Sequence, residues 1–333
     1  GSEMCIRDST ITDPTGATAK KLVVCCLPIA LISVIMTFAN MIDMLTVNPC
    51  IKTAMKASPH TFDSLLSDKL TTDMLPNFIY GSYTGLAVTV FGLVPTITAM
   101  FGKSILPSLA ESCAKNDKKA MQSGLTKMLI VTSIIAIPAG MGIAVLSEPI
   151  LRFLFGGRET EIQVCIMPMS ILGIAVIFLA IATPCFAILQ TLGKPHKAII
   201  IMLAGGIIKL FLNIILIRQP IINISGAAIS TLVSEVFICV LSVRSVCKMT
   251  DLKPKVSEIF VKPTYAAIMC SVTVILSHET LTKIAHLQIN HRFVTLFSIG
   301  IGSTMYFFCL YLLCETPKNI VNCIFSKKNP QNP

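Results

Sequence analysis

The sequence predicts an all-α membrane protein, a polytopic bundle of about eight transmembrane helices. Three observations support this fold class. Eight stretches are apolar for about the 20 residues that a helix needs to cross a hydrocarbon core of roughly 30 Å. Hydrophobic residues make up 53% of the chain and charged residues 13%, which is more apolar surface than a soluble fold of 333 residues could bury. The connecting segments alternate between lysine-rich and lysine-poor.

The predicted spans are helices, because backbone groups in hydrocarbon have no water to bond and no stretch alternates like a barrel strand. Short turns at 193–197 and 218–223 predict an antiparallel cluster of the fourth to sixth spans, whereas 48–76 predicts a long loop. Leu106–Gln122 predicts a short interfacial helix or a solvated connector, and Glu148–Phe155 predicts a second amphipathic helix. In chain order the spans cover 22–47, 77–102, 128–147, 164–192, 198–217, 221–243, 259–277 and 293–314.

Basic residues predict the orientation of the bundle. If Lys20 and Lys21 precede the first span on the cytoplasmic side, that face holds seventeen lysines and arginines and the opposite face holds eight. This bias predicts a multi-pass protein of the cytoplasmic (plasma) membrane with both termini in the cytoplasm. The net charge of +10 does not indicate nucleic acid as a partner, because the basic residues are spread over successive loops instead of forming a patch.

Prolines and small residues indicate how the spans pack. Each proline in a span removes a backbone hydrogen bond, which predicts bent, movable helices or reflects the ordinary frequency of proline in membranes. Gly81-x-x-x-Gly85 and Gly140-x-Gly142 predict faces on which helices approach closely. The prolines in or near spans are Pro28, Pro95, Pro138, Pro168 and Pro184.

The sequence lacks the motifs of metal and nucleotide chemistry. Most of the thirteen cysteines lie inside spans, where thiols act as small hydrophobes, and none forms a CxxC pair. There is no GxxxxGK[ST] loop, and His278, Glu279 and His286 lack the HExxH spacing of a hydrolytic zinc site. We therefore expect no metal, no cofactor and no enzymatic activity.

Charged residues at membrane depth are costly in lipid and usually face a partner or a cavity. Lys209 lies about 12 Å inside its span and Glu235 about 20 Å inside the next, so the two can pair across the antiparallel hairpin, with Asn213 one turn from Lys209. Such a pair either sets the helix register or belongs to a pathway for an anionic substrate or a coupling ion. Asn40 and Asp43 share a face, and their shallow position favours a solvated interface.

The chain divides into four predicted segments. Residues 1–19 form a disordered or non-native N-terminus, because the first nine residues show no periodicity and resemble translated adapter or vector sequence; an ordinary polar tail is the alternative. Residues 20–247 form a six-helix transporter lobe, 248–316 two additional transmembrane helices and 317–333 a cytoplasmic tail.

Three motifs follow one another between Lys20 and Val246. They are LPSLAE at 106–111 with KNDKK at 115–119, PILRFLFG at 149–156, and LQTLGKP at 189–195 leading through GIIK at 206–209 and Asn213 to NISGAA at 223–228. This order resembles the C-terminal half of the multidrug/oligosaccharidyl-lipid/polysaccharide exporter superfamily. It is most similar to the stage V sporulation protein B branch, which is related to the MurJ lipid II flippases.

The resemblance implies a fourteen-helix transporter of two six-helix lobes and two extra helices, of which this chain holds the seventh to fourteenth. It implies a flippase that moves a lipid-linked oligosaccharide or peptidoglycan precursor by alternating access, with the last two spans as candidates for a groove that holds the lipid tail. The implied partners are the lipid-linked substrate, a coupling ion, the missing N-terminal lobe and cell-wall synthesis proteins.

Three other functions stay open. A cation-coupled multidrug antiporter of the same superfamily would use an acidic site such as Glu235. A membrane-embedded transferase or hydrolase acting on lipid-linked sugar would need catalysts, for which His278, Glu279 and His286 form the available cluster. A non-transporting scaffold in a wall-synthesis complex would tolerate loss of Lys209.

Overall fold

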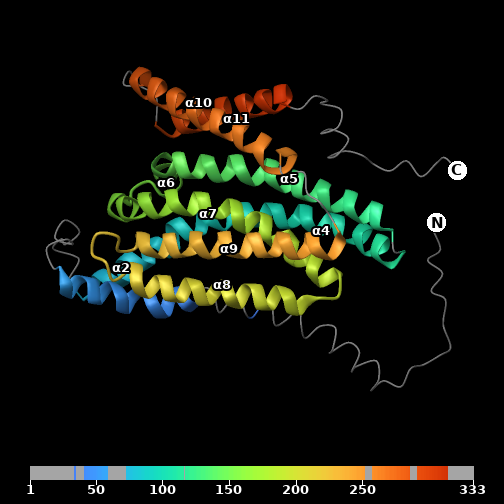
Figure 1. Ribbon diagram of the computed structural model, residues 1–333. Helices are drawn as coiled ribbons and strands as arrows, with labels where there is room; N and C mark the ends of the chain where they lie inside the picture. The colour runs from blue at the N-terminus through green and yellow to red at the C-terminus, as the bar shows by residue number, and fades with distance from the viewer. Residues whose placement is uncertain are drawn as a thin grey trace, which may run out of the picture.

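The computed structural model describes residue 34 and residues 41–58, 73–115, 117–251, 257–285 and 291–313. Within these ranges the chain is helical and contains no strand, which confirms the predicted all-α class. Most of the helices run side by side along one axis, and the last two cross the others at an edge of the bundle (Figure 1).

The helices follow one another with short connections. A helix at 41–57 comes first in the described part. The others are α2 (Leu75–Ser82), η2 (Tyr83–Val88), α3 (Thr89–Phe91), α4 (Leu93–Ala114), α5 (Lys118–Val145), α6 (Ser147–Phe155), α7 (Glu159–Thr191), α8 (Pro195–Leu216), α9 (Ser225–Thr250), η3 (Ser257–Val261), α10 (Lys262–Ala285) and α11 (His291–Leu313).

Seven helical segments in the described part of the chain are long and apolar enough to cross a membrane, which confirms the second to eighth predicted spans and a multi-pass membrane protein. The first predicted span, 22–47, lies mostly outside the described residues. Its end is wrong, because the helix continues to residue 57, through the start of the predicted long loop.

The segment around Leu106–Gln122 also differs from the prediction of a separate interfacial helix. It forms the end of α4, a tight turn and the start of α5, and α4 runs through Pro107 without ending. Leu109 is 2% exposed and packs with Leu125 of α5, so the apolar residues are buried by this hairpin. The second predicted amphipathic helix is confirmed as α6.

Helix α7 lies at the centre of the bundle and packs against α4, α5 and α9. Its two ends contribute to two separate apolar clusters, one of which contains Leu75, Leu151 and Ile162 and the other Leu125 and Leu189. The tight turns after α7 and α8 place α7, α8 and α9 side by side in alternating directions, as predicted (Figure 1). The bundle is therefore held together by apolar packing at both ends of α7.

The proline in the second half of α7 is compensated by a neighbouring helix. Pro184 has no N–H to donate to the carbonyl of Ala180, and the Thr98 hydroxyl of α4 donates to that carbonyl at 3.2 Å. Helix α7 consequently continues without a break through Pro168 and Pro184. Pro28 lies outside the described residues.

Helices α10 and α11 form a pair that packs on the lobe mainly through α5 (Figure 1). Here too a carbonyl that a proline leaves without its helical donor is bonded by a neighbouring helix. Pro138 leaves the carbonyl of Ile134 without its usual helical donor, and the Tyr306 hydroxyl of α11 donates to it at 2.9 Å. Tyr306 is 3% exposed, so this bond joins the pair to α5 through a buried side chain.

Of the predicted small-residue faces, Gly140 lies at a close helix contact, whereas the described part of the chain brings nothing against Gly142 or against Gly81 and Gly85. A Cβ added at Gly140 would lie 2.6 Å from the carbonyl oxygen of Gly173, and one added at Gly173 would meet the α5 backbone at 2.5 Å, so α5 and α7 cross in close contact. Added Cβ atoms at Gly81, Gly85 and Gly142 would meet nothing within 4 Å. The described part of the chain leaves the Gly81 and Gly85 face uncovered.

Candidate functional site

Helix α8 places its polar residues on the face that packs into the lobe. Its buried residues recur at intervals of three and four, which makes one helical stripe. Lys209 and Asn213 belong to that stripe, one turn apart. The buried residues are Ala198, Ile201, Met202, Gly205, Lys209 and Asn213, and the exposed apolar residues of the opposite face are Ile200, Leu203, Ile207, Phe211 and Ile215.

A hydrogen-bonded network joins α8 to the helix at 41–57 and to α9. Lys209 Nζ lies 2.7 Å from Asp43 Oδ2. Asn213 Nδ2 donates to Asp43 Oδ1 at 2.9 Å and to Thr46 Oγ1 at 3.0 Å. The Ser230 hydroxyl of α9 donates to Asn213 Oδ1. Both carboxylate oxygens of Asp43 and both ends of the Asn213 amide are thus engaged.

The network is buried, since Asp43 is 8% exposed, Lys209 9% and Asn213 0%. A buried ion pair does not necessarily stabilise a fold, but removing one of its partners leaves an uncompensated charge. As it stands, the network offers no free charge to a ligand. A charge becomes free in this network when Asp43 binds a proton or when the Lys209 side chain moves away from Asp43.

The predicted Lys209–Glu235 ion pair is wrong, because Lys209 pairs with Asp43 instead. Glu235 lies on α9, and its Oε2 atom is buried without a hydrogen-bond partner among the described residues. The solvated position favoured for Asp43 is also wrong. Asn40, the remaining predicted pathway residue, lies outside the described residues.

Helix length explains the error for Asp43. The predicted span ended at residue 47, which put Asp43 about 6 Å from the end of its helix. The helix in fact continues to residue 57, so about 21 Å of helix follows Asp43. The helix also packs on the lobe near α2, with Val47, Ile51 and Leu75 in one apolar cluster. Asp43 therefore points into a helix interface.

Two residues of the network were not predicted. Thr46 follows Asp43 by three residues, a spacing that places both on one helix face. Ser230 and Ser234 are four residues apart on α9, both buried toward α8. The signal that could have found them is the run of small hydroxyl residues at helical spacing, which is also common in plain packing interfaces of membrane helices.

Helices α8 and α9 approach closely about one helical turn before Lys209, at Gly205 of α8. The Ser234 hydroxyl donates to the carbonyl of Gly205 at 2.8 Å. A Cβ added at Gly205 would lie 2.4 Å from the Ile238 side chain, so glycine is required for this approach. The contact at Gly205 shows which residues of α8 and α9 lie at the same height along the bundle axis.

The ends of the lobe carry exposed ion pairs. Arg152 donates from Nε to Glu148 at 2.9 Å and from Nη1 to Glu159 at 2.6 Å. The hydrogen bond to Glu148 is the main reason why the pKa of Arg152 is raised above its ordinary value. Lys118 lies 3.2 Å from Asp251 at the other end. Such exposed pairs contribute little stability.

In the described ranges, no group of three or more His, Cys, Asp or Glu side chains could hold a metal ion. His278 and Glu279 lie near the end of α10, and Glu279 is exposed. His286 lies outside the described residues.

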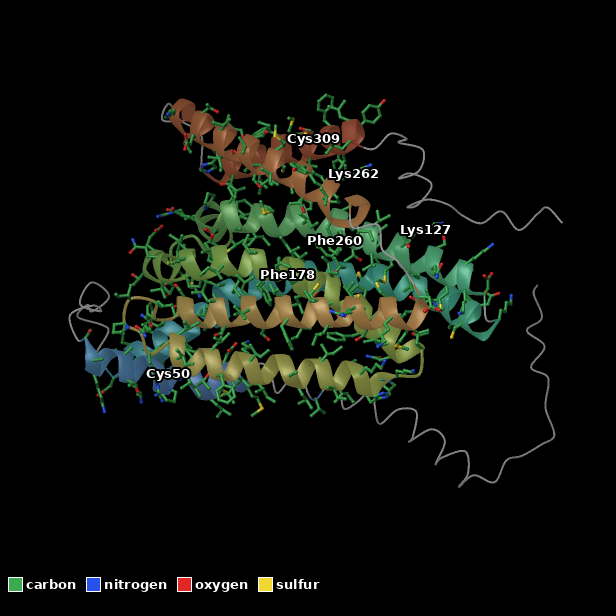
Figure 2. All side chains as sticks on the ribbon, viewed as in Figure 1. Cys50, Lys127, Phe178, Phe260, Lys262 and Cys309 are labelled. Carbon is green, nitrogen blue, oxygen red and sulfur yellow. The ribbon has the colours of Figure 1, made fainter. Side chains whose placement is uncertain are left out.

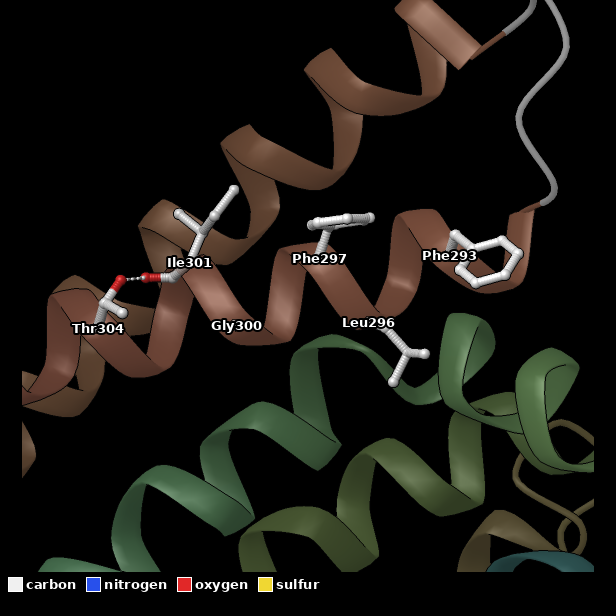
Figure 3. A pocket seen from close by; sticks show the side chains of 6 residues that line it. All are labelled: Phe293, Leu296, Phe297, Gly300, Ile301 and Thr304. Atoms are coloured by element: carbon white, nitrogen blue, oxygen red, sulfur yellow. Dashed lines mark hydrogen bonds between the residues drawn. The ribbon is translucent and has the colours of Figure 1, made fainter.

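Helix α11 lines an apolar cavity of about 440 Å³ at the edge of the bundle. Leu296 points toward the green helices below α11, whereas Phe297 and Ile301 lie on the other side of α11 (Figure 3). The Thr304 hydroxyl donates to the carbonyl of Ile301, so it adds no free polar group. The lining residues are Phe293, Leu296, Phe297, Gly300, Ile301 and Thr304.

Comparison with known proteins decides the family. The sequence profile of the lipid II flippase MurJ matches residues 78–297, which is more than half of the chain. This chain belongs to the MurJ lipid II flippase family. The match runs from within α2 to the start of α11 and includes Lys209 and Asn213 but not Asp43.

Individual relatives of this MurJ-family chain are distant and longer. The lipid II flippase MurJ of Bacillus subtilis is 26% identical over 41% of the chain, and stage V sporulation protein B of the same organism is 23% identical over 54%. The probable low-salt glycan biosynthesis flippase Agl15 of Haloferax volcanii is 26% identical over 55%. These matches span 25%, 34% and 38% of the respective relatives.

A solved structure agrees in fold with the MurJ-family chain. A MOP superfamily transporter from Pyrococcus furiosus superimposes with a TM-score of 0.53 and 15% identity, covering 86% of this chain and 63% of that transporter. The likeness supports the transporter fold and carries no information on substrate.

Proposed function

We propose that this chain is part of a flippase that moves a lipid-linked oligosaccharide or peptidoglycan precursor across the membrane by alternating access, and that it acts as a transporter and not as an enzyme. The observation that carries the proposal is the match to the MurJ family over residues 78–297, within a bundle of seven described candidate spans. In this proposal residues 20–247 form one lobe and 248–316 the two additional helices.

We assign the pathway residues within this lobe to a coupling ion in preference to the substrate headgroup. Lys209 is engaged by Asp43, and Asn213 bonds both Asp43 and Ser230, so neither is available to a pyrophosphate or a sugar. Together with Glu235 and Asn40, these residues form the proposed ion pathway. The apolar cavity of α11 is the proposed contact of the lipid tail, because its lining is almost entirely hydrocarbon and aromatic.

The missing N-terminal lobe is the proposed partner of the uncovered face near α2. Gly81, Gly85, Thr89, Gly92 and Thr96 form a stripe that stays exposed in the described part of the chain. Small and hydroxyl-bearing side chains of this kind are common where membrane helices meet or where a path is wet. A second lobe packed at this face would enclose a central cavity.

We propose that both termini lie in the cytoplasm of a plasma-membrane protein. Lys127 and Lys262 lie toward the end of the bundle where α4 turns into α5, and Cys50 lies toward the opposite end (Figure 2). Thiol labelling of Lys118→Cys and Arg158→Cys variants in intact cells tests this orientation. An impermeant reagent should label the variant at position 158 above the background of the unmodified protein; labelling at 118 instead would reverse the orientation.

A vesicle assay tests the flippase itself. The chain, and the chain joined to the N-terminal half of the Bacillus subtilis relative, are reconstituted with fluorescent lipid II, and an impermeant quencher reports the headgroups that become accessible. The joined protein should move lipid II faster than protein-free vesicles do, and the rate should fall in Lys209→Met. Equal rates in all vesicles would contradict the proposal.

The same assay separates the alternatives. Replacing His278, Glu279 and His286 with alanine should leave the flipping rate unchanged, whereas a transferase or hydrolase would lose its activity. The cation-coupled antiporter is favoured by one observation, the buried carboxylate of Glu235. Such an antiporter would move a small molecule in exchange for a cation and would not move lipid II.

A further inference from the structure

Three ionisable groups lie on α8, α9 and the helix at 41–57. They are two carboxyl groups, Asp43 and Glu235, and one ammonium group, Lys209. Asp43 accepts from Lys209 at 2.7 Å and also from Asn213, while Glu235 Oε2 is buried without a hydrogen-bond partner among the described residues. If both acids were ionised, the group would carry one uncompensated negative charge, which is costly in a low-dielectric interior.

Lys209 lies at the same level as Glu235. Asn213 of α8 bonds Ser230 of α9, and eight residues further into the membrane Gly205 meets Ile238, eight residues beyond Ser230. Because the helices are antiparallel, Lys209 is level with Ser234, the residue before Glu235. The ion pair of Lys209 is formed with Asp43, at 2.7 Å. Rotation of the flexible lysine stem could bring it to either acid.

The surroundings of Glu235 favour a proton over a metal cation. A metal cation needs several ligands, and the described residues contain no group of three or more His, Cys, Asp or Glu side chains that could hold one. The buried titratable groups on α9 and on the helices around it include Lys209, Asp43, Tyr83, Cys165, Cys185 and Cys239. Lys209 is the only one of them that is cationic.

We propose that Glu235 is a proton-binding site and that its proton decides which carboxylate holds Lys209. With the proton bound, Glu235 is neutral and Lys209 stays with Asp43, the arrangement that the structure contains. When the proton leaves to water, two carboxylates compete for one ammonium group. Lys209 then turns toward Glu235 and loosens the contact of α8 with the helix at 41–57. A role of this proton in driving transport rests on the proposed flippase function, whereas the existence of the proton site does not depend on it.

Infrared spectroscopy of the full chain in lipid vesicles tests the inference. A protonated carboxyl group has a C=O band that an ionised carboxylate and a glutamine lack. The unmodified protein should show one such band from a buried acid at mildly acidic pH, and it should vanish as the pH is raised. Glu235→Gln should remove it, and Glu279→Gln, which changes an exposed acid at the end of α10, should leave it in place.

A second variant tests the lysine exchange. Asp43→Asn leaves Lys209 with Glu235 as its remaining carboxylate, so Glu235 should ionise and the band should be lost at a pH where the unmodified protein keeps it. Absence of any buried-acid band in the unmodified protein overturns the proposal without need of a variant. Persistence of the band in Glu235→Gln, its survival in Asp43→Asn, or its loss on adding sodium at constant pH overturns it as well.

The infrared experiment contains no lipid substrate, so its outcome is independent of flipping. A missing band would remove the proton site and leave the flippase proposal standing. A protein that shows the band but does not move lipid II in the vesicle assay would remove the flippase proposal alone.

Discussion

Replacing Lys209 with methionine should destabilise the lobe more than any exposed charge change. Methionine has a similar length but leaves Asp43 buried at 8% exposure, with the bond from Asn213 and without the ammonium group that lies 2.7 Å away. Breaking a buried pair from one side costs about 3 to 5 kcal/mol in soluble proteins. On the scaling of soluble domains, this corresponds to a fall in Tm of roughly 6 to 20 °C.

The double variant Lys209→Met/Asp43→Asn removes both charges while an amide oxygen still accepts from Asn213. It should recover most of the lost stability, to within about 1 kcal/mol of the unmodified protein, because the uncompensated charge is gone. Lys118→Met, which breaks the exposed pair with Asp251, is the matched control and should leave Tm almost unchanged.

The chain supplies its own reporter for this measurement. It contains no tryptophan, but it has thirteen cysteines, and Cys165, Cys185 and Cys239 are buried in the described part. A dye that becomes fluorescent on reacting with thiols therefore follows thermal unfolding in detergent. A loss below about 1 kcal/mol in Lys209→Met, or a double variant as unstable as the sum of the single variants, would refute the reasoning.

Two further predictions concern helix packing. Gly173→Ala should destabilise the lobe by about 1 to 3 kcal/mol, because its Cβ would lie 2.5 Å from the backbone nitrogen of Ala144; Gly142→Ala, where the space is open, should be neutral or slightly stabilising in the same thiol assay. Tyr306→Phe should cost about 1 to 3 kcal/mol, since it leaves the carbonyl of Ile134 without the donor that replaces a missing helical bond, and unchanged stability would argue that water satisfies that carbonyl.

Much of the fold could be predicted from hydropathy and turn length. The second to eighth spans are confirmed because a helix that crosses hydrocarbon needs a long uninterrupted apolar run, which is visible in one dimension. The boundaries were less predictable. Helix α4 continues past the predicted end of its span at residue 102 and through Pro107 because Leu109 packs with Leu125, a contact between two helices that no local pattern reveals.

The site was predictable only in part. Spacing placed Lys209 and Asn213 on one face of α8, and both are buried there. The partner of Lys209 was predicted wrongly, because Glu235 is close along the chain whereas Asp43 is 166 residues away. Likewise Gly140 was recognised as a packing residue without its partner Gly173, and Gly81 and Gly85 look the same in sequence but face open space.

The sequence by itself determined that the chain is a membrane-spanning helical bundle, and it determined which residue types are costly in the bilayer. It did so because burial in lipid depends on the composition and length of each segment. Only the tertiary structure decided that Asp43, not Glu235, neutralises Lys209, and that two proline-freed carbonyls are bonded by Thr98 and Tyr306. Those pairings depend on the rotation and level of one helix against another, which arise from packing across the whole lobe.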